Sequence, residues 1–261
     1  IYLDKHTSLN QTKVLTKIVS DYIGSSRNPM IILDTESILR DRKMFSARGA
    51  GILGFSIFGN KRIYAFDDSM KIEIDKVQQF INQNKDRKIF LFGFTYIVYE
   101  HFIKQLKNEN IKINLKNSVL IHGGGWKKLL DKSVSPNEFK MNLKDVCGLN
   151  KVYDYYGMVE QTGSIYMECE KGNLHAPIFS DIIIRNPIDF SASPTGSEGI
   201  IQTLSILPKS YPGHSILTED LGVMLGEDDC GCNRLGKYFR ILGRIKNAEL
   251  RGCSDTYNDR N

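Results

Sequence analysis

The stretch Lys151-Val-Tyr-Asp-Tyr-Tyr156, followed by Gly157-Met-Val-Glu160-Gln-Thr-Gly163, divides this 261-residue sequence into two parts of different character. Its first six residues are typical of a β-strand, and Gly157 ends that strand. Upstream, apolar runs alternate with helix-like segments, whereas downstream short strand-like pieces are separated by Gly, Pro, Asn and Asp. The first part therefore predicts a mostly parallel sheet flanked by helices. The second predicts a small β-rich subdomain, either an antiparallel sheet or a distorted barrel.

Individual elements follow from the same patterns. Apolar runs and helical periodicity upstream predict, in order, a helix at 7–22 capped by Thr7 or Ser8, a strand at 30–34, a strand at 88–93, a helix at 96–106, a strand at 119–122 and a helix at 137–146. Downstream, strands are expected at 182–185, 199–204, 215–218 and 238–242. We therefore expect an α/β subdomain at 1–163, a β-rich subdomain at 164–243 and a terminal segment at 244–261.

The composition favours a soluble globular protein of the cytoplasm. Hydrophobic residues make up 41% and charged residues 25%, and the net charge is +5. The lysines are interspersed with acidic residues, so nucleic-acid binding is not expected. The sequence has no apolar run long enough for a membrane span, and its first residues do not have the pattern of a signal peptide. Because the first residue is Ile1 and not Met, we expect that the beginning of the protein is missing. Without a secretion signal, the five cysteines favour metal or thiol chemistry over disulfides.

Glycines lie at the ends of three of the predicted strands of the first part. They are Gly93, the run Gly123-Gly124-Gly125, and Gly157, and ligands of open parallel sheets bind beyond such strand ends. Bare backbone lets a flat ligand or an anion approach, while Tyr156 offers a stacking face and Glu160 a carboxylate for Mg²⁺ on a phosphate. Each glycine could instead serve only a turn. Together they favour one ligand-binding site beyond the carboxyl ends of these strands.

Three short motifs now resemble those of the adenylate-forming superfamily. Tyr156-Gly-Met-Val-Glu160 resembles its "YGxTE" motif, Leu217-Thr-Glu-Asp220-Leu-Gly222 its "TGD" motif, and Gly243-Arg244 running on to Arg251-Gly252 its hinge motif. They occur in the family's order. The narrower likeness is to acyl-protein synthetases, carried by His122-Gly-Gly-Gly-Trp-Lys-Lys128, by Tyr156 to Gly163 and by Arg251-Gly-Cys-Ser-Asp255.

This resemblance implies ATP- and Mg²⁺-dependent activation of a fatty or similar carboxylic acid to an acyl-adenylate. It assigns Gly123, Gly124, Gly125 and Tyr156 to the adenine pocket of an ATP or AMP site, and Gly157 to the same nucleotide site. By the same likeness Glu160 holds Mg²⁺, Asp220 accepts hydrogen bonds from the ribose hydroxyls, and Arg244 meets the ribose or phosphate. Standing alone, Asp220 could be a turn cap and Arg244 a surface ion pair.

Two substitutions and two absences depart from the family pattern. Val159 stands where the family has Thr, and Glu219 stands where it has Gly. The family's phosphate loop is not found before the matched segments, nor its closing lysine after them. We therefore expect an N-terminally incomplete adenylate-forming fold that by itself binds ATP poorly.

Cys253 is the catalytic residue that the resemblance implies, because acyl-protein synthetases accept the acyl group on a cysteine near their end. Arg251 beside it favours the reactive thiolate. The acyl group then passes to a partner, an acyl reductase or another acceptor protein. The alternative is an inert, partly buried thiol.

A second group of thiols has the pattern of a metal site. Cys230-Gly-Cys232 forms a close pair, and Cys169 and His175 flank a predicted hairpin at 170–174. Three thiols and one imidazole can bind a structural Zn²⁺ tetrahedrally, and phenylacetate-CoA-ligase-like proteins show a similar arrangement. The alternative is buried cysteines without a ligand. Cys147 follows an apolar helix face and is expected in the core.

Two other functions stay open on this sequence. One is an acyl- or aryl-CoA ligase of the phenylacetate type, which the Cys/His pattern favours. The other is a non-catalytic module that binds AMP or an acyl chain, or docks a partner, which the missing phosphate loop favours. For the acyl-adenylate reaction, His122 beside the predicted pocket is expected to serve packing or substrate contact and not proton transfer.

Overall fold

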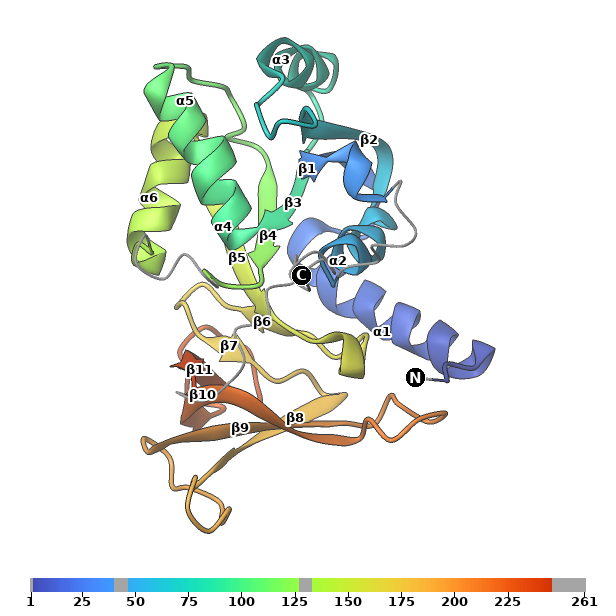
Figure 1. The fold of residues 1–261 in the computed structure, drawn as a ribbon, viewed down its shortest axis with the longest axis vertical. Helices are drawn as coiled ribbons and strands as arrows, with labels where there is room; N and C mark the ends of the chain where they lie inside the picture. The colour runs from blue at the N-terminus through green and yellow to red at the C-terminus, as the bar shows by residue number, and fades with distance from the viewer. Residues whose placement is uncertain (1, 40–46, 127–132, 246–261) are drawn as a thin grey trace, which may run out of the picture. The chain divides into compact units, whose positions relative to one another are not determined.

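A computed structural model describes residues 2–39, 47–126 and 133–245 (Figure 1). These residues form two compact units. One contains residues 22–153, and the other contains residues 2–21 together with 154–245. The change from one unit to the other falls between Tyr153 and Asp154, before the boundary drawn from the sequence at Gly163. The first helix groups with the β-rich strands, although the sequence alone placed it in the α/β part.

The unit of residues 22–153 contains a parallel sheet. Its strands neighbour one another in the order β2 (Gly59–Phe66), β1 (Asn28–Thr35), β3 (Phe90–Phe94), β4 (Val119–Gly123) and the start of β5 (Lys151–Tyr156). β1 pairs in parallel with β2 and β3, and β3 with β4. Every residue of β1, β3 and β4 is buried, so these strands appear in the sequence as continuous apolar runs. The predicted mostly parallel sheet is confirmed.

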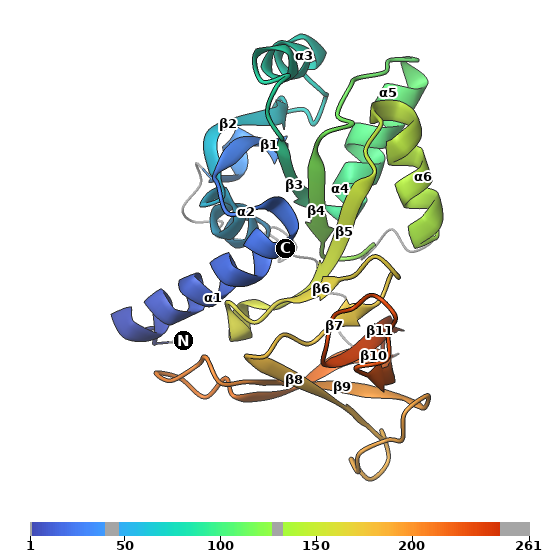
Figure 2. The ribbon, with the colours of Figure 1, turned by 180° about the vertical axis from the view of Figure 1, so that it is seen from behind.

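Helices pack along this sheet. They are the short η1 (Glu36–Leu39), α2 (Ala47–Ser56), α3 (Ile74–Gln83), α4 (Thr95–Ile97) leading through a π-helical stretch (Val98–Ile103) into α5 (Lys104–Asn108), and α6 (Pro136–Cys147). α5 and α6 lie side by side in both views (Figures 1 and 2). The predicted helices at 96–106 and 137–146 are confirmed, whereas α2, α3 and β2 were not predicted, although α3 buries an apolar face of Val77, Phe80 and Ile81.

The first helix, α1 (Lys5–Ile23), starts at a residue that the sequence did not single out. Asp4 Oδ1 accepts a hydrogen bond from the backbone N–H of Thr7 at 2.7 Å, and Thr7 itself is buried inside the helix. The predicted cap, Thr7 or Ser8, is therefore wrong. A carboxylate at this place both accepts an orphan N–H and faces the positive end of the helix dipole, and these hydrogen bonds lower the pKa of Asp4.

The β-rich unit is an antiparallel sheet. Its strands follow the order β6 (Tyr166–Glu168), β7 (Leu174–His175), β11 (Lys237–Arg244), β10 (Ser215–Glu227), β9 (Glu198–Ser205) and β8 (Ser180–Arg185). The sheet curls, because Tyr166 of β6 donates a hydrogen bond to the carbonyl of Asp181 in β8 at 3.0 Å. The curl encloses a core of Tyr166, Leu174, Ala176, Ile182, Ile184, Ile201 and Phe239. Both the β-rich character and the hairpin at 170–174 agree with expectation.

Within the described ranges, no helix combines the length and the apolar character that crossing a lipid bilayer requires.

Gly163 offers a test of the packing in the β-rich unit. Its φ is +88°, and a Cβ atom there would lie 2.7 Å from the carbonyl oxygen of Gln11 in α1. We expect Gly163→Ala to lower the free energy of unfolding by about 2–4 kcal/mol, measured by urea denaturation, because backbone strain and a clash with backbone add. Gly196→Ala is the matched control, since Gly196 has a φ of +85° and open space around it. Equal losses for the two variants would contradict the predicted clash.

Candidate nucleotide and metal sites

Tyr156 and Asp220 meet side by side although they are far apart in the sequence. Tyr156 ends β5, and its hydroxyl donates a hydrogen bond to Asp220 Oδ2 at 2.7 Å. Burial of the phenol, and next to it the charge of Asp220, raise the pKa of Tyr156 well above its ordinary value. Tyr156 is therefore a permanent proton donor toward the carboxylate. Two residues that the sequence assigned to one ligand are in direct contact.

A bulge in β10 aims the Asp220 side chain. Leu217 pairs with Gln202 of β9, and the next paired residue, Leu221, faces Ile200, so β10 carries two more residues than β9 over this interval. The Thr218 hydroxyl donates to the carbonyl of Ile201 at 2.7 Å and accepts from the backbone N–H of Asp220 at 3.1 Å. Bulges of this kind re-aim side chains next to functional sites. Asp220 thus lies inside a strand, not in a turn.

Arg244 lies opposite Asp220 on the neighbouring strand. The register of β10 and β11 pairs the two residues, and Arg244 Nε is 3.6 Å from Asp220 Oδ1. Arg244 also forms an ion pair with Glu219 through Nη2. The surface-ion-pair alternative for Arg244 is therefore present in this structure. Glu219, which departs from the family's glycine, has its charge offset by that pair.

A buried glutamine, which the sequence did not single out, anchors the turn after β5. Gln161 is 1% exposed, and its Nε2 donates to the carbonyl of Gly213 at 2.8 Å. It closes the 3₁₀ turn η5 (Val159–Gln161), on which Val159 and Glu160 are exposed. Glu160 is thus free to reach a ligand from a fixed turn. Gly157 precedes this turn, and a Cβ on it would lie 3.1 Å from Ile165.

The segment Gly123–Gly125 belongs to the other unit, at the end of β4. Gly123 is buried in the strand, while Gly124 and Gly125 are exposed with φ of 83° and 61°. Nothing lies within 4 Å of a Cβ placed on Gly125, so its backbone is open to solvent. The adenine role of these glycines stays a prediction.

His122, just before these glycines, is a packing residue in this structure. Its ring is 5% exposed and lies 4.6 Å from the ring of Phe139, and Nδ1 is 2.9 Å from the Thr95 hydroxyl. Burial, with a smaller contribution from Lys140, lowers the pKa of His122 to about 3. The imidazole is therefore neutral near pH 7, in agreement with the expectation that it serves packing.

Cys169, His175, Cys230 and Cys232 form a cluster in the β-rich unit. One ligand atom from each lies within 4.8 Å of all the others, with Cys169 Sγ 3.7 Å from Cys230 Sγ and Cys232 Sγ 3.4 Å from His175 Nε2. Cys169 follows β6, His175 is in β7, and the other two lie in the loop between β10 and β11. Three sulfurs and one imidazole nitrogen are the donor set of a structural zinc site.

Backbone and amide N–H groups support the sulfurs of this cluster. Lys171 N donates to Cys169 Sγ at 3.4 Å, and Asn173 Nδ2 donates to Cys230 Sγ at 3.3 Å. Arg240 in turn holds Asn173 through Oδ1 at 3.0 Å. Donors of this kind stabilise thiolates and fix the orientation of metal ligands. The residues present therefore fit a metal ion, and sequence reasoning had missed Asn173 and Arg240.

The whole range 1–261 matches the family model described as acyl-protein synthetase, LuxE. The chain belongs to the acyl-protein synthetase LuxE family. The resemblance noted in the sequence is thereby confirmed, and so is the adenylate-forming fold class that it implied.

Two curated relatives match this chain over more than two thirds of its length. The long-chain-fatty-acid–luciferin-component ligase of Vibrio harveyi is 25% identical over 190 residues, covering 70% of this chain and 49% of the relative. The enzyme of the same name from Aliivibrio fischeri is 26% identical over 195 residues, covering 72% of this chain and 50% of the relative. The chain therefore spans about half the length of the curated relatives that it matches.

Solved structures show the same fold at low identity. The 2-hydroxyisobutyryl-CoA ligase in complex with 2-HIB-AMP and CoA, in an open conformation, matches with a TM-score of 0.64 at 16% identity, covering 90% of this chain and 50% of that chain. ATP-bound MatB from Rhodopseudomonas palustris matches with a TM-score of 0.56 at 16% identity, covering 90% and 44%. The acyl-protein synthetase chain thus shares its fold with adenylate-forming ligases.

Two cysteine predictions have different outcomes. Cys253, the implied acyl acceptor of this acyl-protein synthetase chain, lies outside the described residues, as do Arg251 and Gly252. Cys147 is 1% exposed in α6, its Sγ donates to the carbonyl of Leu143 at 3.0 Å, and burial raises the pKa of its thiol to about 12. Cys147 is a core residue, as expected.

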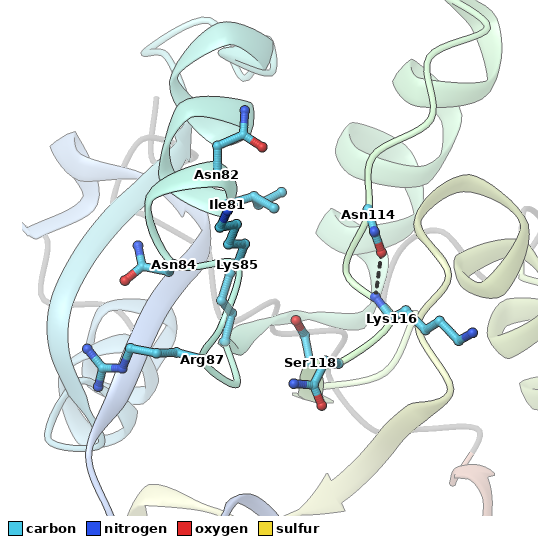
Figure 3. Close-up of a pocket in the computed structure, with 10 residues that line it drawn as sticks. Ile81, Asn82, Asn84, Lys85, Arg87, Asn114, Lys116 and Ser118 are labelled. Atoms are coloured by element: carbon cyan, nitrogen blue, oxygen red, sulfur yellow. Dashed lines mark hydrogen bonds between the residues drawn. The ribbon is translucent and has the colours of Figure 1, made fainter.

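A surface cavity of about 490 Å³ lies in the unit of residues 22–153, near the residues where β3 and β4 begin (Figure 3). Gly124 and Gly125, in contrast, follow the end of β4. Its lining combines apolar residues such as Ile81 and Ile89 with the cationic side chains of Lys85, Arg87 and Lys116. Figure 3 shows Arg87 and Lys116 pointing in opposite directions, so their charges do not converge on one ligand. We therefore do not assign an anion-binding role to this cavity.

Proposed function

We propose that the protein activates a fatty or similar carboxylic acid with ATP and transfers the acyl group to a cysteine. The observation that carries the proposal is the contact between Tyr156 and Asp220, 2.7 Å between Oη and Oδ2, in a chain of the acyl-protein synthetase family. The two curated relatives, whose names include fatty acid and ligase, support the same substrate class.

The proposed reaction has two steps. A carboxylate oxygen of the acid attacks the α-phosphorus of ATP, the bond between the α-phosphorus and the bridging oxygen breaks, and pyrophosphate leaves. The thiolate of Cys253 then attacks the acyl carbonyl carbon, the bond to the phosphate oxygen breaks, and AMP leaves. A partner protein accepts the acyl group from this thioester. Neutralising phosphate charge is the main catalytic need, so no acid–base histidine is required.

Asp220 has acceptor capacity left for a ribose. A carboxylate offers about four lone-pair sites, and here one oxygen accepts from Tyr156 while the other faces Arg244 at 3.6 Å. Ribose hydroxyls would add to this arrangement, with Tyr156 and Gly157 beside the nucleotide. Arg244 is exposed enough to exchange its Glu219 partner for the ribose or a phosphate.

In this proposal the Glu160 carboxylate would hold Mg²⁺ together with the phosphates, the usual way in which this ion is bound. Cys169, His175, Cys230 and Cys232 would hold Zn²⁺. That ion would act as a structural cross-link, since four protein ligands leave no open position for a substrate.

The test is the chemical form of the activated acyl group. With ATP, Mg²⁺ and a labelled long-chain acid, we expect the full-length protein that contains these residues to acquire a hydroxylamine-labile label, and we expect its Cys253→Ser variant to lose the label while still exchanging pyrophosphate into ATP. Cys147→Ala, which changes a buried thiol, is the matched control and should retain the label.

Two other outcomes would contradict this proposal. Formation of acyl-CoA by Cys253→Ser when CoA is supplied would favour the CoA-ligase alternative. Nucleotide binding without any pyrophosphate exchange would favour the non-catalytic binding module.

A further inference from the structure

The metal cluster and the Tyr156–Asp220 contact are built on the same strands. Cys169 and His175 belong to the β6–β7 hairpin, whose strand β6 pairs with β5 through Tyr156 and Tyr166. The loop between β10 and β11 supplies the other two cysteines, and the opposite end of that hairpin carries Asp220 and Arg244. One hairpin therefore extends toward Tyr156 and the other carries Asp220.

The two hairpins are joined by a short ladder. β7 and β11 pair through His175 with Tyr238 and Leu174 with Phe239, and the backbone N–H of Ala176 donates to the carbonyl of Lys237 at 2.9 Å. One side-chain contact adds to this ladder, since Arg240 donates to Asn173 Oδ1 at 3.0 Å. A ladder this short holds two hairpins less firmly than a long one, since each backbone hydrogen bond contributes about 1 kcal/mol net. A metal ion that binds two side chains from each hairpin would cross-link them next to this ladder.

Aromatic packing connects this ladder to the nucleotide residue. The Phe239 ring is fully buried and lies edge-on to Tyr156, with ring centroids 6.2 Å apart, and edge-on to Tyr166 at 5.5 Å. Tyr238, the preceding residue, stacks on the His175 ring at 5.5 Å. Packed aromatic rings have few alternative arrangements, so a shift of β11 against β7 would displace the Tyr156 ring.

We propose that metal binding at Cys169, His175, Cys230 and Cys232 positions Tyr156 against Asp220 and so raises the affinity for the nucleotide. This inference rests on the proposed nucleotide site and adds a dependence of that site on the metal. The four ligands and Phe239 are positioning residues, because they act on the nucleotide only through Tyr156. Coupling between two sites typically changes affinity by about 5- to 150-fold.

The experiment measures AMP binding by calorimetry on the full chain. The protein is first stripped with a chelator, its fold is checked by far-UV circular dichroism, and half is reloaded with ZnCl₂ to one equivalent. We expect AMP to bind about tenfold more weakly without zinc. Because coupling is reciprocal, saturating AMP should raise the zinc affinity by the same factor, which a purely structural metal would not show.

Three variants distinguish loss of the metal from loss of the packing that connects it to Tyr156. Cys230→Ser should lose zinc and weaken AMP binding, while Leu235→Ala, an exposed residue of the same loop, should change neither. Phe239→Leu should keep one zinc per chain and yet bind AMP more weakly, with a smaller effect of zinc removal. If the chelator-treated protein does not remain folded, the AMP affinity of zinc-loaded Phe239→Leu, compared with that of the zinc-loaded parent, tests the proposal.

The outcomes that overturn the inference are distinguishable. Equal AMP affinity with and without zinc overturns the coupling and leaves both sites in place. Failure of the purified chain to bind zinc overturns the metal site. Failure of the zinc-loaded chain to bind AMP overturns the proposed nucleotide function, and with it the coupling.

Discussion

Asp220→Asn is expected to weaken AMP binding by about 10- to 100-fold and to lower acyl-adenylate formation at least as much. The physical reason is that Asp220 is a charged acceptor, and hydrogen bonds to charged groups contribute about 1.5–3 kcal/mol each. The variant keeps the shape of the side chain and one carbonyl oxygen, which can still accept from Tyr156 at the end of β5. A loss of affinity therefore reports the missing charge and not a collapsed site.

Asp189→Asn is the matched control for this substitution. Asp189 is an exposed carboxylate between β8 and β9 whose partner is the neighbouring Ser191. We expect this control to bind AMP as the parent protein does in calorimetry at the same salt concentration. If Asp220→Asn also bound AMP normally, the ribose role of Asp220 would be wrong, and the nucleotide site would have to be sought elsewhere.

His122 is expected to make the protein acid-sensitive. The pKa of His122 is about 3 in the folded protein, because burial disfavours the imidazolium, against about 6.5 in the unfolded chain. Below pH 6.5 the unfolded chain therefore binds a proton that the folded chain does not, and stability falls as the pH drops. From pH 7 to pH 4 this one group should remove on the order of 3 kcal/mol from the free energy of unfolding.

The measurement is a pair of urea unfolding curves at pH 7 and pH 4. His122→Asn cannot take up this proton, so its stability should fall less between the two pH values than that of the parent, even if it starts lower. Exposed His214→Asn is the control and should keep the parental difference. A pH difference in His122→Asn as large as that of the parent would show that other groups cause the acid sensitivity.

Some elements could be predicted from local sequence because a single factor, such as burial of a whole strand, determines their residue types. β1, β3 and β4 are buried along their whole length, so they had to be continuous apolar runs. The Cys169 to His175 hairpin was visible in its turn residues. In contrast, β2 has three consecutive exposed residues, Asn60, Lys61 and Arg62, so its apolar run is interrupted by polar and charged side chains and was not predicted. The cap of α1 was missed because Thr7 and Ser8 are also residue types that cap helices, and only the folded structure shows that Asp4 accepts the hydrogen bond.

The sequence alone determined which chemical groups this protein has and their order along the chain. Three motifs resemble those of the adenylate-forming superfamily, three stretches carry the narrower likeness to acyl-protein synthetases, and the spacing of three cysteines and one histidine predicts a set of metal ligands. Those inferences need only residue types at fixed offsets, because the chemistry of a carboxylate or a thiol belongs to the residue itself.

Only the tertiary structure decided which of these groups meet. The bulge that aims Asp220, the buried Gln161 that anchors the turn of Glu160, and the curl that brings β6 to β8 depend on pairings between distant strands. Such pairings are set by side-chain packing across the sheet, which no local pattern encodes. The contact between Tyr156 and Asp220, on which the proposed function depends, is a property of the folded chain.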